Sequence, residues 1–159
     1  MGPIAVCLWF NGQAEEAARF YASIFPDSGV DEVSRSSADT PSGPKGMVLT
    51  VGFHLNGQRF VGLNGGPEFT FSEAISFVID CESQAEVDRY WGALTADGGS
   101  PGPCGWLKDR FGVSWQVVPT RLYELVGGPD PAAAERAMKA MLEMSKIEVA
   151  ELERAYASG

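Results

Sequence analysis

The sequence has one histidine, three cysteines and few basic residues, and each shortage argues against a class of function. It carries 12 lysines and arginines against 21 aspartates and glutamates, a net charge of −9. A surface that binds nucleic-acid phosphates would therefore work against the field of the whole molecule. A single histidine also leaves no plausible Ser-His-Asp arrangement. We expect neither a nucleic-acid partner nor a hydrolase of the triad type.

Long apolar runs are missing too. No stretch approaches the roughly 20 apolar residues of a membrane-spanning helix, and the first residues show no basic and then apolar signal segment. We expect a cytoplasmic protein without a membrane partner. Cys7, Cys81 and Cys104 show no C-x-x-C spacing, so we interpret them as reduced thiols that mostly pack. Cys104 as a nucleophile is the alternative, but no histidine lies near it in sequence.

The sequence predicts one order of strands and helices that occurs twice, over a length typical of one domain. An apolar run predicts a strand from Ile4 to Phe10, and an apolar stripe closed by Pro26 predicts a helix. The stripe consists of Ala14, Ala17, Ala18, Tyr21, Ile24 and Phe25. Strands are predicted over 30–36, 47–55 and 59–64, with a loop over 36–46. Asn56-Gly57 predicts a two-residue hairpin turn, because a type I′ turn needs positive φ at both central residues.

The order then begins again. A strand is predicted from Ala74 to Asp80, and the capping box Ser83 to Glu86 opens a helix that ends at Gly98-Gly99. Short strands over 100–108, a turn from Asp109 to Gly112 and a strand over 113–118 follow. Shifting this half back by 70 residues places 74–80 on 4–10 without a gap, which indicates a weak internal repeat.

A helical tail completes the chain. Residues 121–126 favour a short helix, and Asp130 before Pro131 is typical of a helix N-terminus. The capping box Ser145 to Glu148 predicts a last helix. The tail packs on its own sheet or on a second subunit, and the sequence leaves both open.

Four phrases carry a family resemblance: LWFNGQAEEAARFY, FHLNGQRFVGLNGGPEF, FSEAISFVIDCESQAEVDRYW and CGWLKDRFGVSWQVVP. With the repeated βαβββ order, they resemble the PhnB-like branch of the vicinal oxygen chelate superfamily, which holds glyoxalase I, bleomycin resistance proteins and extradiol dioxygenases; the tail resembles that branch as well. The resemblance implies an α+β fold of two βαβββ modules, 1–66 and 67–119, that form a curved mixed sheet and a ligand-binding cup. The helical tail, 120–159, completes one structural domain.

Members of this branch are often labelled 3-demethylubiquinone-9 3-methyltransferase. A nucleoside methyl donor usually needs a glycine-rich turn between a strand and a helix N-terminus. The glycine-rich stretches here, 65–67 and 98–105, lie between the modules and after a helix, where they are typical of turns. We therefore predict no cofactor.

The superfamily's metalloenzymes hold a divalent cation with His, Gln or Glu from the first and last strand of each module. The resemblance places the four positions near Val6, Val61, Ser76 and Gln116. Only Gln116 can bind a metal, whereas a catalytic metal keeps about three protein ligands. The sole histidine, His54, lies on a different strand, and Glu73 is the one carboxylate that a register error would admit. We predict no metal site.

A cup without a metal depends on its other inward-facing groups, and apolar walls with a few polar groups are typical of small-molecule sites. The candidates are Trp9, Asn64, Phe71, Glu73, Trp106, Lys108 and Gln116. Trp115 is a further aromatic, and for each of these residues a packing role is the alternative. Two functions remain: a protein that binds or sequesters a small molecule, or an enzyme, whether a metal-dependent lyase or dioxygenase or the labelled methyltransferase. The resemblance and a methionine-rich tail also lead us to expect a homodimer.

Overall fold

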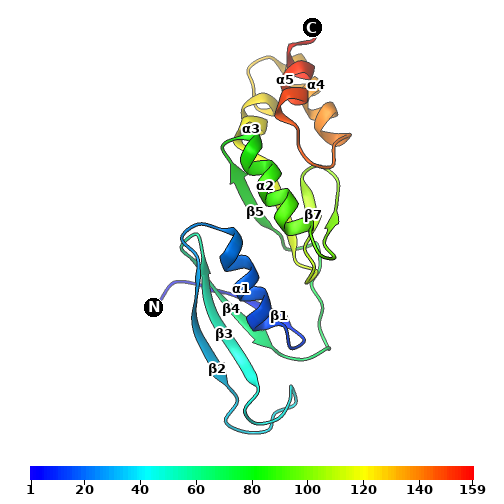
Figure 1. The fold of residues 1–159 in the computed structure, drawn as a ribbon. Coiled ribbons are helices and arrows are strands. Elements are labelled where there is room, and N and C mark those ends of the chain that lie inside the picture. The colour runs from blue at the N-terminus through cyan, green and yellow to red at the C-terminus, as the bar shows by residue number, and fades with distance from the viewer. The chain divides into compact units, whose positions relative to one another are not determined.

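A computed structural model of the protein describes residues 1–159, which divide into two compact units, Met1–Phe71 and Ser72–Gly159 (Figure 1). The first unit contains β1 (Val6–Phe10), α1 (Ala14–Ile24), β2 (Gly29–Arg35), β3 (Val48–Leu55) and β4 (Gln58–Asn64). The second contains β5 (Phe77–Cys81), α2 (Gln84–Thr95), β6 (Ser100–Pro101), β7 (Trp106–Lys108), β8 (Ser114–Pro119), α3 (Thr120–Val126), α4 (Pro131–Leu142) and α5 (Val149–Ala157).

Each unit has its own four-stranded mixed sheet with the same topology. The strand orders are β1-β4-β3-β2 and β5-β8-β7-β6. In each, the first and last strands of the module pair in parallel and the other neighbours are antiparallel. The predicted α+β class with two βαβββ modules is confirmed.

Local signals placed most of these elements. The stripe of the first predicted helix, apart from Phe25 just after its end, forms the buried face of α1, and Tyr21 of this face stacks on Phe53 of β3. Asn56 and Gly57 have φ of 47° and 78°, as the predicted hairpin turn requires. Ser83 accepts a hydrogen bond from the Glu86 amide at 3.3 Å, which confirms the cap of α2.

The internal repeat is not free of gaps, contrary to what the 70-residue shift predicted, because its strands and its helices match at different offsets. The fifth strand begins at Phe77 rather than Ala74, because the residues before it turn, with the Ile75 amide donating to the Ser72 carbonyl at 3.5 Å. Strands β1 and β5 therefore match at an offset of 71 residues, whereas α1 and α2 match at 70. Side chains on a strand alternate between faces, so this one residue decides which first-strand side chains are equivalent.

The tail packs on its own unit. Helices α3, α4 and α5 share a core with the end of β8, made of Val118, Leu122, Leu125, Ala137, Ile147 and Leu152. Asp130 caps α4 as predicted, accepting from the Ala132 and Ala133 amides at 3.0 and 3.2 Å. No helix of the chain has the length and apolar character needed to cross a bilayer.

The predicted capping box of the last helix is wrong. Helix α5 begins at Val149, and Glu148 at its N-cap makes no side-chain cap. Gln84 of α2 does this instead: its Oε1 accepts from the Val149 amide at 2.8 Å, and its Nε2 donates to the Ile147 carbonyl at 3.0 Å. A glutamine far away in sequence thus ties the tail to the second module.

Ser145 has another role, at the segment that joins β6 to β7. Its hydroxyl donates to the Gly102 carbonyl at 2.7 Å. The Cys104 amide donates to the Met144 carbonyl at 2.8 Å, and the Gly105 amide to the Ser145 carbonyl at 2.7 Å. The tail therefore holds residues 102–105 in place, largely through main-chain groups.

Candidate pocket of the second unit

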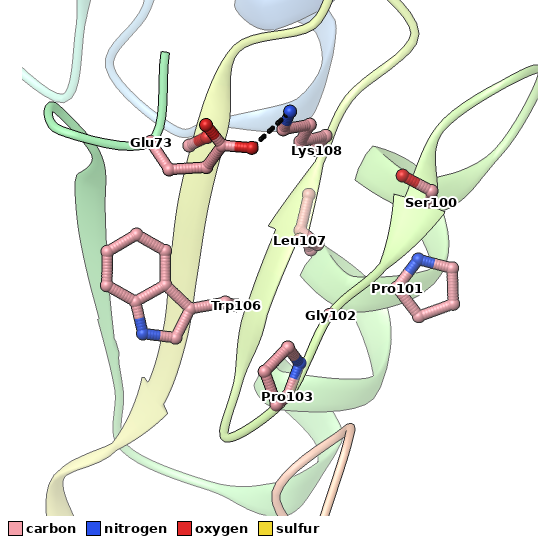
Figure 2. A pocket seen from close by; sticks show the side chains of 9 residues that line it. Glu73, Ser100, Pro101, Gly102, Pro103, Trp106, Leu107 and Lys108 are labelled. Atoms are coloured by element: carbon pink, nitrogen blue, oxygen red, sulfur yellow. Dashed lines mark ion pairs between the residues drawn. The ribbon is translucent and has the colours of Figure 1, made fainter.

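The second unit contains a pocket of about 540 Å³, within the range of roughly 300–1,000 Å³ that is usual for small-molecule sites. Figure 2 shows the pocket, whose residues come from β6, β7, the segment between them, the start of β8 and the turn before β5. The lining residues are Glu73, Ser100, Pro101, Gly102, Pro103, Trp106, Leu107, Lys108 and Ser114.

Strand register places the polar and aromatic groups of the pocket on one face of the sheet. In the antiparallel β7–β8 pair, Lys108 lies opposite Ser114 and Trp106 opposite Gln116. Directly paired residues project to the same side, and alternate residues share a face. Trp106, Lys108, Ser114 and Gln116 therefore share one face. Leu107, between Trp106 and Lys108, is buried with the residues that pack against α2.

The turn that joins β7 to β8 is organised by a buried carboxylate. Asp109 Oδ1 accepts from the Phe111 and Val113 amides at 2.8 and 3.1 Å. Its Oδ2 accepts from Trp115 Nε1 at 2.9 Å. The turn predicted at this position is confirmed. Trp115 is buried in the core and bound to Asp109, which agrees with the packing alternative.

Lys108 and Glu73 form an ion pair at the pocket (Figure 2). Their side chains are 42% and 62% exposed. The hydrogen bond from Lys108 is the main reason that the pKa of the Glu73 carboxyl lies below its ordinary value. Glu73 lies in the turn before β5, whereas Lys108 is part of a strand. The pair therefore joins a cation on the sheet to a carboxylate on an exposed turn.

Ser114 is a pocket residue that sequence reasoning missed. The residue is 2% exposed, and its hydroxyl is buried without a hydrogen-bond partner. A buried hydroxyl without a partner is uncommon and points to a ligand or water. Its alternation with Gln116 was visible in the sequence, but its place opposite Lys108 depends on the hairpin register. The wall at Pro101, Gly102 and Pro103 was also missed, because that stretch was interpreted as a turn.

Gln116 lies beside the pocket on the same face. Its Nε2 donates to Ser76 Oγ at 2.9 Å, and its strand neighbour is Trp106. Of the predicted cup residues, Glu73, Trp106 and Lys108 thus come together in one pocket, and Gln116 lies next to it. This grouping, with Ser114 added, is the strongest candidate site in the chain.

The three other predicted residues lie in the first unit. Trp9 donates from Nε1 to the Gly66 carbonyl at 2.8 Å, and its ring meets Phe69 edge-on with centroids 4.9 Å apart. Phe71 meets Phe10 edge-on at 5.3 Å. Both aromatics thus make packing contacts within their own unit.

Asn64 has a structural role there. It is buried, and both ends of its amide are engaged. Its Oδ1 accepts from the Ala14 amide at 2.9 Å, which caps α1, and its Nδ2 donates to the Val48 carbonyl at 2.9 Å. With both polar groups satisfied, we assign Asn64 to the fold rather than to a ligand.

The superfamily's metal can be tested against the side chains at its expected positions. On the last strands, Val61 and Gln116 pair with Cys7 and Val78, respectively. The expected positions on the first strands therefore move from Val6 and Ser76 to Cys7 and Val78. Neither residue is a carboxylate or an imidazole. No three or more His, Cys, Asp or Glu side chains gather to hold a metal anywhere in the chain. These residues do not fit a metal that needs about three protein ligands.

Neither the sole histidine nor the glycine-rich turns provide a site for a metal or a methyl donor. His54 on β3 pairs with Asp31 on β2, Nδ1 to Oδ1 at 2.9 Å, which occupies it at the sheet surface. A nucleoside methyl donor usually binds at a glycine-rich turn in a doubly wound parallel sheet. Both sheets here are mixed, and the turn from β5 to α2 contains only Glu82 and Ser83. The residues do not fit such a cofactor.

Comparison with known proteins places the chain in a family. The family described as 3-demethylubiquinone-9 3-methyltransferase matches residues 3–118. A Bacillus cereus protein named PhnB, assigned by name as a 3-demethylubiquinone-9 3-methyltransferase, is 34% identical with a TM-score of 0.65, over 75% of this chain and all of that one. No match was found among curated proteins.

More distant structures share the fold. The protein PA1353 from Pseudomonas aeruginosa is 21% identical, with a TM-score of 0.61 over 75% of this chain and 98% of that one. The fosfomycin resistance protein FosX from Listeria monocytogenes is 15% identical, with a TM-score of 0.50 over 75% and 93%. The family match ends before α3, so the helical tail lies outside it. The chain belongs to the 3-demethylubiquinone-9 3-methyltransferase family and is similar to PhnB.

Proposed function

We propose that this protein binds a small molecule in the pocket of its second unit, and that it does so without a metal. The observation that carries the proposal is the gathering of an aromatic ring, a cation and an unpartnered buried hydroxyl around one cavity, from Trp106, Lys108 and Ser114. Apolar walls with a few placed polar groups are the usual composition of such sites. The side chains at the expected metal positions support binding without a metal.

The test is a fragment screen by residue-resolved NMR, with and without EDTA or added divalent ions. We expect bound fragments to shift the resonances of the pocket residues, and neither EDTA nor metal to change their affinity. Trp106→Ala should weaken binding. Trp91→Ala removes a similarly half-buried indole from α2, outside the pocket, and should not.

An enzyme is the alternative outcome of the same experiment. Metal-dependent turnover of a glyoxalase-like or dioxygenase-like substrate, or transfer of a methyl group, would contradict a purely binding protein. So would fragments that bind only elsewhere on the chain. Binding at the pocket that persists unchanged in EDTA supports the proposal.

We also propose a homodimer. Helix α4 exposes Met138 and Leu142, four residues apart and hence on one side of the helix. Such apolar groups suit a protein contact. Light scattering should give a mass near twice the chain mass of 17.0 kDa, and a mass equal to one chain would contradict the dimer.

A further inference from the structure

The pocket contains one cation and one carboxylate, and the two differ in how firmly the fold holds them. Lys108 lies on β7, where pairing with Ser114 fixes its backbone. Glu73 lies outside any strand or helix, in a turn with an exposed side chain. No other lining residue is charged. The lysine is thus anchored to the sheet through its backbone, whereas the carboxylate that meets its ammonium comes from an exposed turn.

We propose that the ligand is a small organic monoanion, a carboxylate on an apolar or aromatic body, which takes the place of Glu73 on the Lys108 ammonium. The inference rests on the proposed function and names its ligand class. Ser114, directly opposite Lys108, lines the pocket, and its buried hydroxyl lacks a hydrogen-bond partner. Trp106, two residues from Lys108 on the same face, supplies an indole for the body of the ligand.

A carboxylate suits this pocket better than a phosphate or phosphonate. Strong phosphate sites use arginine forks or several backbone amides. No arginine lines the pocket. Its wall offers few amides, because Pro101 and Pro103 have no N–H and the Gly102 amide already donates to the Trp106 carbonyl at 2.7 Å.

Charge balance leads to the same class. Once Glu73 moves away, the pocket carries one positive charge, which a monoanion neutralises. A dianion would leave a negative charge inside a chain of net charge −9. Arg110, the next cation along the chain, faces Asp97 at 3.7 Å and the Phe111 ring at 5.0 Å, so it belongs to another contact.

The experiment compares three probes that share a phenyl ring by NMR titration of the full chain: phenylacetate, phenylacetamide and phenylphosphonate. We expect phenylacetate to bind most tightly, at least about fivefold better than the amide, because a charge-assisted hydrogen bond is stronger than a neutral one. The resonances of Trp106, Lys108 and Ser114 should move.

Variants at the ion pair test whether Lys108 and Glu73 determine the affinity for phenylacetate. Lys108→Met should remove the preference for phenylacetate over phenylacetamide. Glu73→Gln should tighten phenylacetate by about two- to fivefold, because an exposed ion pair is weak and its loss frees the ammonium. Glu82→Gln removes an exposed carboxylate just beyond β5, outside the pocket, and should leave the affinity unchanged.

The outcomes separate the two proposals. If phenylacetamide or phenylphosphonate binds at the pocket as tightly as phenylacetate, the monoanion inference is wrong and the binding function stands. The inference is equally wrong if Glu73→Gln weakens phenylacetate. If none of the three probes moves the pocket resonances although other fragments do, the inference is wrong and the binding function stands; if no fragment of the screen moves them either, both proposals fail.

Discussion

Asp109→Asn tests whether one buried carboxylate positions the β7–β8 hairpin and, with it, the pocket. Asp109 is 3% exposed and accepts from two backbone amides and from Trp115 Nε1. In the variant, Oδ1 can still accept from the amides, but an NH₂ group faces the indole N–H. A hydrogen bond to a charged group contributes about 1.5–3 kcal/mol and a neutral one about 1 kcal/mol. We expect a loss of about 3 kcal/mol in the free energy of unfolding.

The assay is urea unfolding followed by NMR signals of the second unit, because two compact units need not unfold together. Asp97→Asn is the matched control, since Asp97 is 78% exposed and meets Arg110 only at 3.7 Å. It should change the free energy by less than about 0.5 kcal/mol. The Lys108 and Ser114 resonances should shift in Asp109→Asn alone. Equal, small losses in both variants would refute the assignment.

Three further predictions concern the tail, the ion pair and a buried thiol. Leu152→Ala, at a residue with 0% exposure, should cost about 2–5 kcal/mol in urea unfolding. Ile75→Ala, at 71% exposure and outside the tail, should cost under about 0.5 kcal/mol, and equal costs would contradict the tail core. An NMR titration should place the pKa of Glu73 below its ordinary 4.5, and Lys108→Met should raise it toward that value, because the Lys108 hydrogen bond is the largest cause of the lowering. Any stability from this pair is present above the unfolded-state pKa and is lost as the pH falls through the lowered one. Burial raises the pKa of Cys81 to about 12, so mass spectrometry should find it unmodified by iodoacetamide at neutral pH until the chain unfolds.

The elements that the sequence predicted are those with local causes. The stripe of α1, the Asn56-Gly57 turn and the Asp130 cap each depend on residues within a few positions of one another. The structure has them where the pattern placed them. The family resemblance rested on longer stretches of sequence, and it implied the two βαβββ modules that the structure contains.

The pocket depended on contacts that are distant in sequence or on strand register. Ser114 becomes a site residue only because the hairpin register sets it opposite Lys108. The same holds for the N-terminus of α5. The sequence predicted that Ser145 caps this helix, but the side chain that accepts from its first amide, at Val149, is that of Gln84. Ser145 lies in a good local capping pattern, but its hydroxyl gains a tertiary partner in the Gly102 carbonyl. Tertiary contacts overrode local preference at these positions.

The hydrogen bonds from the tail to residues 102–105 couple the tail to the pocket thermodynamically. Gly102 and Pro103 line the cavity, and the Met144–Ser145 segment holds the adjoining main chain. A ligand that orders this wall must stabilise the docked tail by the same free energy with which the docked tail favours the ligand. Susceptibility of α4 and α5 to proteolysis would then report occupancy of a pocket that the protease never touches.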